Sequence, residues 1–256
     1  MLKNRLHPKA MMSETTALLA SPDADKEFAW DVGLIGERKN ALLDLTYCEG
    51  APKPTLRGVL HLVALVLTPL WAYLVVKSCS PVASFSCMLA VAFTVASPPF
   101  CWAISVAYHH GNWSTPEAER LLQKLDHMGV ALSIAGMITP LILLALPSIG
   151  RYLLVALWCF AAVVCILVLR GLSSVPLFGG LVLFAMPALY WIHSTEIVLF
   201  ACSALSSMIG ALAYTHNWLE LWPGVWSSHE SFHFFTIVGT GFATFVNYSV
   251  IQRSCG

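Results

Sequence analysis

The 256-residue chain is 57% hydrophobic and only 11% charged, with a formal net charge of zero and a mean hydropathy of +0.72. About a quarter of the residues of a soluble domain are charged. This composition therefore excludes a soluble globular protein and indicates a multi-pass integral membrane protein. The sequence has no basic run that would neutralise a phosphate backbone, which sets nucleic-acid binding aside.

The polar residues are concentrated before the first apolar stretch. Residues 1–57 hold 8 of the 14 basic residues, and residues 1–56 hold 8 of the 14 acidic ones. No apolar core of signal-peptide length follows the first basic residues. We therefore predict a cytosolic, largely disordered N-terminal tail at 1–56 and a transmembrane domain at 57–251.

Seven apolar runs of spanning length follow the tail, separated by short polar or Gly/Pro-containing turns. A backbone in lipid must satisfy its own hydrogen bonds, so each run is predicted as a helix of an all-α, seven-transmembrane bundle. Prolines at 98, 99, 140 and 187 fall inside these runs and should kink them. The predicted spans are 58–76, 82–108, 121–146, 152–169, 175–192, 197–214 and 229–250.

The orientation follows from the distribution of Lys and Arg. With a cytosolic amino terminus, the cytosolic side receives eleven of these residues and the opposite side three. Because positive charge is enriched on the cytoplasmic side, we predict that the amino terminus is cytosolic.

His229 and His233 lie four residues apart at the start of the last span. This spacing places both imidazoles on one face of a helix, where they can point at a common atom. Ionisable side chains at the mouth of a membrane span tend to pair, bind an ion or line a wet cavity. The alternative is a pair of interfacial histidines that only face water.

The predicted topology brings further polar residues to the same membrane level. His109 and Ser105, again four residues apart, end the second span, and Asp126 begins the third. Three imidazoles that leave a fourth position for water are typical of a zinc site that activates water, so His109, His229 and His233 are the predicted Zn²⁺ ligands.

Two polar residues are predicted to act beside these ligands. Asp126 would orient a histidine or accept a proton from the water, and Ser105 would donate a hydrogen bond to the water or a substrate oxygen. The alternatives are a helix N-terminal acid favoured by the dipole for Asp126, and a hydroxyl bonded to its own helix for Ser105.

These residues form three blocks: Ser105-x3-His109, then Leu125-Asp126-His127-x-Gly129 with Thr139-Pro140, then His229-x3-His233. Their spacing and their places on the spans resemble the hemolysin III and progestin/adipoQ receptor (PAQR) family, over about residues 50–250. The run Pro52-Lys-Pro-Thr-Leu-Arg-Gly-Val-Leu-His61 before the first span also fits. The family's Glu-x-x-Asn-x3-His block is not reproduced upstream, so no role is predicted for Glu49 or His61.

The resemblance implies a seven-helix bundle with a cytosolic amino terminus and a zinc ion near the cytosolic face. By it, His109, His229 and His233 match the metal ligands, and Asp126 and Ser105 match the accompanying polar pair. Members are described as receptors, as lipid amidases related to alkaline ceramidases, or as hemolysins. The resemblance therefore favours a zinc-dependent hydrolase of a membrane-lipid amide or ester, with a seven-helix signalling receptor or membrane-remodelling protein containing structural zinc as the alternative.

Two smaller alternatives arise from the residues themselves. His229-Glu230-x-x-His233 fits the H-E-x-x-H motif of zinc proteases, in which the glutamate is the general base. Cys79 and Cys255 both fall on the predicted outer side and would be able to form a disulfide. His193 and Glu196 are predicted to lie in the loop after the fifth span.

Overall fold

A computed structural model describes residue 47, residue 50 and residues 52–147 and 150–256. Within these residues, six helices are long and apolar enough to cross a membrane. They are α3 (Val59–Lys77), α4 (Phe85–His110), α5 (Pro116–Ala145), α6 (Gly150–Leu169), α8 (Ser194–Thr215) and α9 (Ser228–Cys255). The tail predicted at 1–56 lies almost entirely outside the described residues.

The remaining predicted span is a composite element. Helix α7 (Val175–Val182) continues as the 3₁₀ helix η1 (Leu183–Tyr190), which contains Pro187. A 3₁₀ helix rises about 2.0 Å per residue against about 1.5 Å for an α-helix, so the two together reach about 28 Å, close to the hydrocarbon thickness of a bilayer. The described chain therefore agrees with seven antiparallel spans, and the 3₁₀ geometry is found where a proline was expected to disturb the helix.

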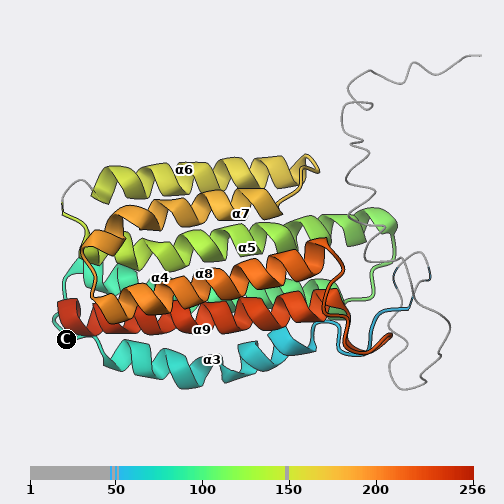
Figure 1. Ribbon diagram of the computed structural model, residues 1–256, viewed down its shortest axis with the longest axis horizontal. Helices are drawn as coiled ribbons and strands as arrows, with labels where there is room; N and C mark the ends of the chain where they lie inside the picture. Colours follow the sequence, from blue (N-terminus) through green and yellow to red (C-terminus); the bar gives the residue numbers. More distant parts are fainter. Residues whose placement is uncertain (1–46, 48–49, 51, 148–149) are drawn as a thin grey trace, which may run out of the picture.

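The helices form one elongated bundle, with α3 and α6 at opposite edges (Figure 1). Helix α5 lies between α4 and α6 and also contacts α7 and α9. Its fully buried Ala131 and Ala135 and the close approach of Gly136 to Ser97 of α4 explain this central place, because small residues let membrane helices approach closely.

Helices α8 and α9 are joined along their length by small and polar residues. The hydroxyls of Ser203 and Ser206 on α8 donate to the carbonyls of Gly239 and Phe235 on α9, at 2.7 and 2.8 Å. A Cβ at Gly239 would lie 2.6 Å from the Ser207 hydroxyl, so the absent side chain is what allows this approach. In lipid the hydrophobic effect does not drive helices together, so interhelical hydrogen bonds and close packing of this kind stabilise their association.

Some predicted ends differ from the observed ones. Helix α5 begins at Pro116 rather than at residue 121, because the Thr115 hydroxyl caps it by accepting from Ala118 N at 3.2 Å, with Pro116 in the first turn. The predicted loop position of Glu196 is wrong. Glu196 lies in the first turn of α8, 1% exposed, and accepts hydrogen bonds from His193 N and from Arg253 and Ser249 of α9.

The predicted pairing of Cys79 with Cys255 is also wrong. Cys255 forms a disulfide with Cys87, which joins the first turn of α4 to the last turn of α9. Cys79 lies in the α3–α4 loop, where its thiol faces the Ser80 carbonyl. The first turn of α4 packs against the end of α9, and sequence position alone did not reveal this contact.

Candidate metal centre

Three histidines from two helices meet at one end of the bundle. His109 lies in the last turn of α4, and His229 and His233 lie in the first two turns of α9. All three are buried, and one possible ligand atom from each lies within 4.8 Å of the others. We refer to His109, His229 and His233 as the histidine triad.

The spacing of the triad suits a metal ion. His109 Nε2 and His229 Nε2 are 3.2 Å apart, and a tetrahedral ion bound through nitrogen at about 2.0–2.1 Å separates its ligand atoms by about 3.3–3.4 Å. His233 Nε2 is buried and has no hydrogen-bond partner among the described residues. A buried nitrogen without a partner costs free energy, and a bound metal ion would supply that partner. The three imidazoles could therefore hold a metal ion.

Local sequence explains how α9 presents its two histidines. Ser227 and Glu230 form a capping box, in which the Glu230 carboxylate accepts from Ser227 N at 2.8 Å and the Ser227 hydroxyl accepts from His229 N at 3.2 Å. This cap fixes the start of α9 at Ser228, so His229 and His233 fall on its first two turns.

Asp126 and Ser105, predicted to act beside the ligands, are both buried at this end of the bundle. Asp126 Oδ2 lies 3.6 Å from His109 Nε2, the same nitrogen that faces His229. Ser105 lies one turn before His109, and its hydroxyl has no hydrogen-bond partner in the described part of the chain. The carboxylate therefore faces the shared point of the triad rather than the far side of His109.

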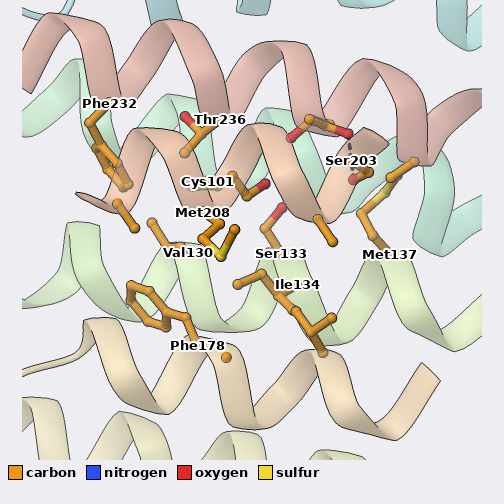
Figure 2. Close-up of a pocket in the computed structure, with 18 of the residues that line it drawn as sticks. Cys101, Val130, Ser133, Ile134, Met137, Phe178, Ser203, Met208, Phe232 and Thr236 are labelled. Atoms are coloured by element: carbon orange, nitrogen blue, oxygen red, sulfur yellow. Dashed lines mark hydrogen bonds between the residues drawn. The ribbon is translucent and has the colours of Figure 1, made fainter. Parts of the chain in front are cut away.

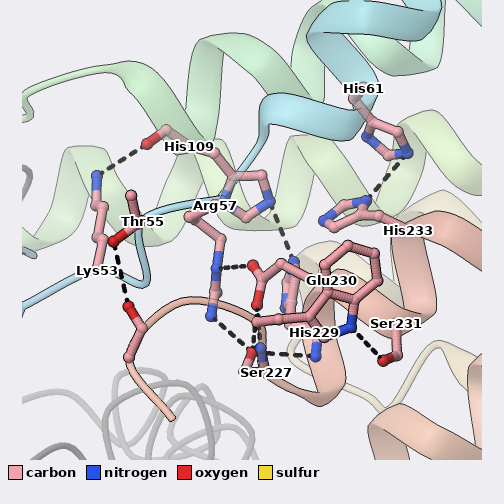
Figure 3. Close-up of polar contacts among 12 residues, drawn as sticks. Lys53, Thr55, Arg57, His61, His109, Ser227, His229, Glu230, Ser231 and His233 are labelled. Atoms are coloured by element: carbon pink, nitrogen blue, oxygen red, sulfur yellow. Dashed lines mark hydrogen bonds and ion pairs between the residues drawn. The ribbon is translucent and has the colours of Figure 1, made fainter. Parts of the chain in front are cut away.

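Glu230 does not face that point. Its Oε1 lies 2.7 Å from Arg57 Nε, with the two side chains 1% and 2% exposed, and its Oε2 accepts from Ser227 (Figure 3). Arg57 also donates to the Tyr47 hydroxyl at 2.8 Å. A glutamate held in a buried ion pair and a helix cap is poorly placed to be the general base of an H-E-x-x-H protease.

The residues just before α3 lie across this end of the bundle. Thr55 N and Leu56 N donate to the carbonyls of Gly224 and Val225 in the α8–α9 loop, at 3.1 and 3.2 Å. Lys53 Nζ lies 3.3 Å from the carbonyl of His109 (Figure 3). Burial lowers the pKa of Lys53. The Glu119 carboxylate opposes this lowering, and the Arg57 cation adds to it.

Gly58, which precedes α3, is required by the triad itself. It has a φ of +77°, and a Cβ built on it would lie 2.7 Å from His109 Cβ. Only glycine combines that backbone conformation with so close an approach. The start of α3 is therefore fitted against a triad histidine.

A cavity of about 470 Å³ begins at two members of the triad, His229 and His233, and extends into the bundle. Its walls are mostly apolar and come from α4, α5, α7, α8 and α9, with His61 of α3, and they include Ile134, Met137, Phe178 and Met208 (Figure 2). Asp126, His229 and His233 line it at one end, and Asn247 lines it at the other, where its amide donates to the Met137 carbonyl at 3.0 Å. The arrangement offers a long apolar chamber with imidazoles and a carboxylate at its head.

The structure also places His61, for which the sequence predicted no role, beside the triad. His61 Nε2 lies 3.0 Å from His233 Nδ1, and His61 is 3% exposed. His127, next to Asp126, instead faces Ser174, with 3.3 Å between His127 Nδ1 and the hydroxyl. A sequence signal for His61 existed, namely a histidine in the first turn of a span that starts at the level of the triad.

A sequence profile of the family described as haemolysin-III related matches residues 50–244 of the chain. The chain belongs to the haemolysin-III-related family. The match begins before α3 and ends within α9, so it includes every residue of the triad, and it confirms the family resemblance. This haemolysin-III-related protein is a multi-pass integral membrane protein, as its composition predicts.

Proposed function

We propose that the protein is a zinc-dependent hydrolase that acts on an amide or ester of a membrane lipid, near the cytosolic face of the membrane. The observation that carries the proposal is the convergence of three buried imidazoles beside the Asp126 carboxylate, with Asp126, His229 and His233 lining the head of an apolar cavity. Small-molecule sites are typically apolar pockets with a few convergent polar groups, and this arrangement fits that description.

The donor set favours zinc, because neutral imidazoles suit it and three of them leave a fourth position open. When bound, zinc would lower the pKa of a coordinated water towards neutrality and polarise a carbonyl oxygen. Asp126 Oδ2 faces the shared point of the triad, so it would accept the proton that the nucleophile loses. The Ser105 hydroxyl, which has no partner among the described residues, would donate a hydrogen bond to the substrate oxygen.

The cavity supports a lipid as substrate. A volume of about 470 Å³ lies within the range of small-molecule sites, and its apolar walls would hold a hydrocarbon chain while the scissile group lies beside Asp126. Substrate selection by this cavity would rest on chain length and shape rather than on charge.

Two observations support a cytosolic position for the triad. The Lys/Arg distribution favours a cytosolic amino terminus, which places the start of α9 on that side. The Cys87–Cys255 disulfide lies at the other ends of α4 and α9, and disulfides persist in oxidising compartments rather than in the cytosol. From Cys87 to His109, α4 rises about 33 Å, the thickness of a hydrocarbon core.

The test is hydrolysis of a panel of labelled lipid amides and esters by purified protein, with and without a zinc chelator. Asp126→Asn should keep its bound zinc but lose about 10²–10⁴-fold in turnover, because it removes the proton acceptor and not a metal ligand. His127→Ala, at the neighbouring position, should also keep its bound zinc, because His127 faces Ser174 and not the triad.

Two results would contradict the hydrolase. Turnover that survives complete removal of zinc would refute metal-dependent hydrolysis. Stoichiometric zinc without turnover on any lipid of the panel would favour the signalling or membrane-remodelling role, with zinc as a structural ion.

A further inference from the structure

His61 reaches the triad from a third helix. It lies in the first turn of α3, and its ring meets the His233 ring edge-on with centroids 4.0 Å apart. The contact joins His61 Nε2 to His233 Nδ1 at 3.0 Å, with both side chains buried (Figure 3). It is a hydrogen bond between two imidazoles, so one nitrogen must carry the proton.

The direction of that hydrogen bond follows if His233 binds a metal. A ligating histidine uses one ring nitrogen for the metal and keeps a proton on the other. His233 Nε2 is the nitrogen without a partner among the described residues, and Nδ1 is the one that faces His61. His233 Nδ1–H would therefore donate, and His61 Nε2 would accept.

We propose that His61 is a positioning residue for the metal centre, which fixes the tautomer and ring orientation of His233 by accepting its Nδ1–H. This inference rests on the metal site of the proposed function and names a residue that the ligand blocks do not contain. It also explains why an imidazole is buried at the start of α3. A leucine would fill the same space but would leave the Nδ1–H of His233 unsatisfied in a buried site.

His61 is distinguished from the neighbouring histidines by its partner. His127 also lines the cavity, but it faces the Ser174 hydroxyl and not a member of the triad. His110 adjoins His109 in sequence, yet its ring lies against Gly58. A general loss of cavity polarity should therefore affect His127 variants as much as His61 variants, whereas loss of ligand positioning should affect His61 alone.

The experiment measures zinc affinity of the full-length protein in detergent, by competition with a chromophoric chelator. His61→Leu should weaken zinc binding about 10–100-fold, as expected when the partner of a ligating histidine is removed. His61→Gln, whose amide oxygen can occupy the place of Nε2 and accept the same proton, should stay within a few-fold of the wild type. His127→Leu, the matched control, should bind zinc as the wild type does.

A second readout separates positioning from packing. With Co²⁺ in place of zinc, the visible absorption spectrum should change in His61→Leu and be retained in His61→Gln, because the spectrum reports ligand geometry. Equal losses in the two variants would refute the hydrogen-bond role. A loss as complete as that of His233→Ala would make His61 a fourth ligand instead.

The outcome is separable from the test of hydrolysis. A wild-type protein that binds zinc without hydrolysing any lipid would refute the hydrolase, yet the affinities and cobalt spectra would still decide the role of His61. A wild-type protein that binds neither zinc nor cobalt would overturn the metal site and the role of His61 with it.

Discussion

The Arg57–Glu230 pair offers the sharpest test of how the site is held together. The two charges lie 2.7 Å apart and are 2% and 1% exposed, so water screens them little. Removing one partner of a buried pair costs about 3–5 kcal/mol, because the other charge is left uncompensated. Glu230→Gln keeps an oxygen near Arg57 Nε, so we expect a loss of stability near the lower end, about 3 kcal/mol.

A double-mutant cycle isolates the interaction. Arg57→Met alone should cost about as much as Glu230→Gln, because each remaining group keeps two other partners. The carboxylate keeps Ser227 N and Oγ at 2.8 and 2.5 Å, and the guanidinium keeps the Tyr47 and Ser227 hydroxyls at 2.8 and 3.4 Å. The double variant buries no unpaired charge, so it should be more stable than the sum of the single losses predicts, with a coupling of about 2–3 kcal/mol.

The assay is reversible unfolding of the full-length protein in mixed detergent micelles, followed by helical circular dichroism. Additive losses would show that the two residues do not act as a unit, and the ion-pair reasoning would be wrong. A Glu230→Gln protein that is fully stable and binds zinc, yet has lost all hydrolytic activity, would instead restore the H-E-x-x-H protease with Glu230 as base.

Three further predictions concern the metal, the backbone and the orientation. Alanine at any member of the triad should sharply lower bound zinc, measured by elemental analysis, whereas His110→Ala should retain it; the reverse result would mean that the wrong face of α4 was assigned. Gly58→Ala should destabilise the protein and displace zinc more than Gly224→Ala, as measured by thermal unfolding and zinc content of both variants. Both glycines have a φ of +77°, but of the two only Gly58 has a neighbour within 4 Å of the added Cβ. Asn112, in an Asn-Trp-Ser sequence between α4 and α5, should carry no glycan in a glycosidase mobility-shift assay, and modification there would place the triad on the non-cytosolic side.

Much of the architecture could be predicted from local sequence, because each span must satisfy its own backbone in lipid. Apolar runs located the spans, and the four-residue spacing of His229 and His233 predicted that they share a face. The meeting of His109 with them followed from counting membrane crossings. Hydropathy was less informative about helix ends. Helix α5 starts before its apolar run, at a cap whose sequence is Thr115-Pro116.

The contacts that could not be predicted join residues far apart in the chain. Arg57 lies 173 positions from Glu230, and His61 lies 172 positions from His233. The local pattern does not say which side chain His61 or His127 faces, and it does not distinguish Glu230 from the base of a zinc protease. The partner decides the role in each case, and the partner is set by tertiary packing.

These distant contacts fix α9 at both ends, which is what the site needs from it. At the triad end, Arg57 holds Glu230 and His61 holds His233; at the other end, Glu196 holds Arg253 at 2.6 Å and the Cys87–Cys255 disulfide ties α9 to α4. Ligand atoms must hold their positions to within about 0.5 Å for a metal site to function, and side chains on a secured helix meet that demand better than those on a loop. The same two histidines on a helix free to slide by one residue would rotate about 100° away from His109, and the triad would be lost.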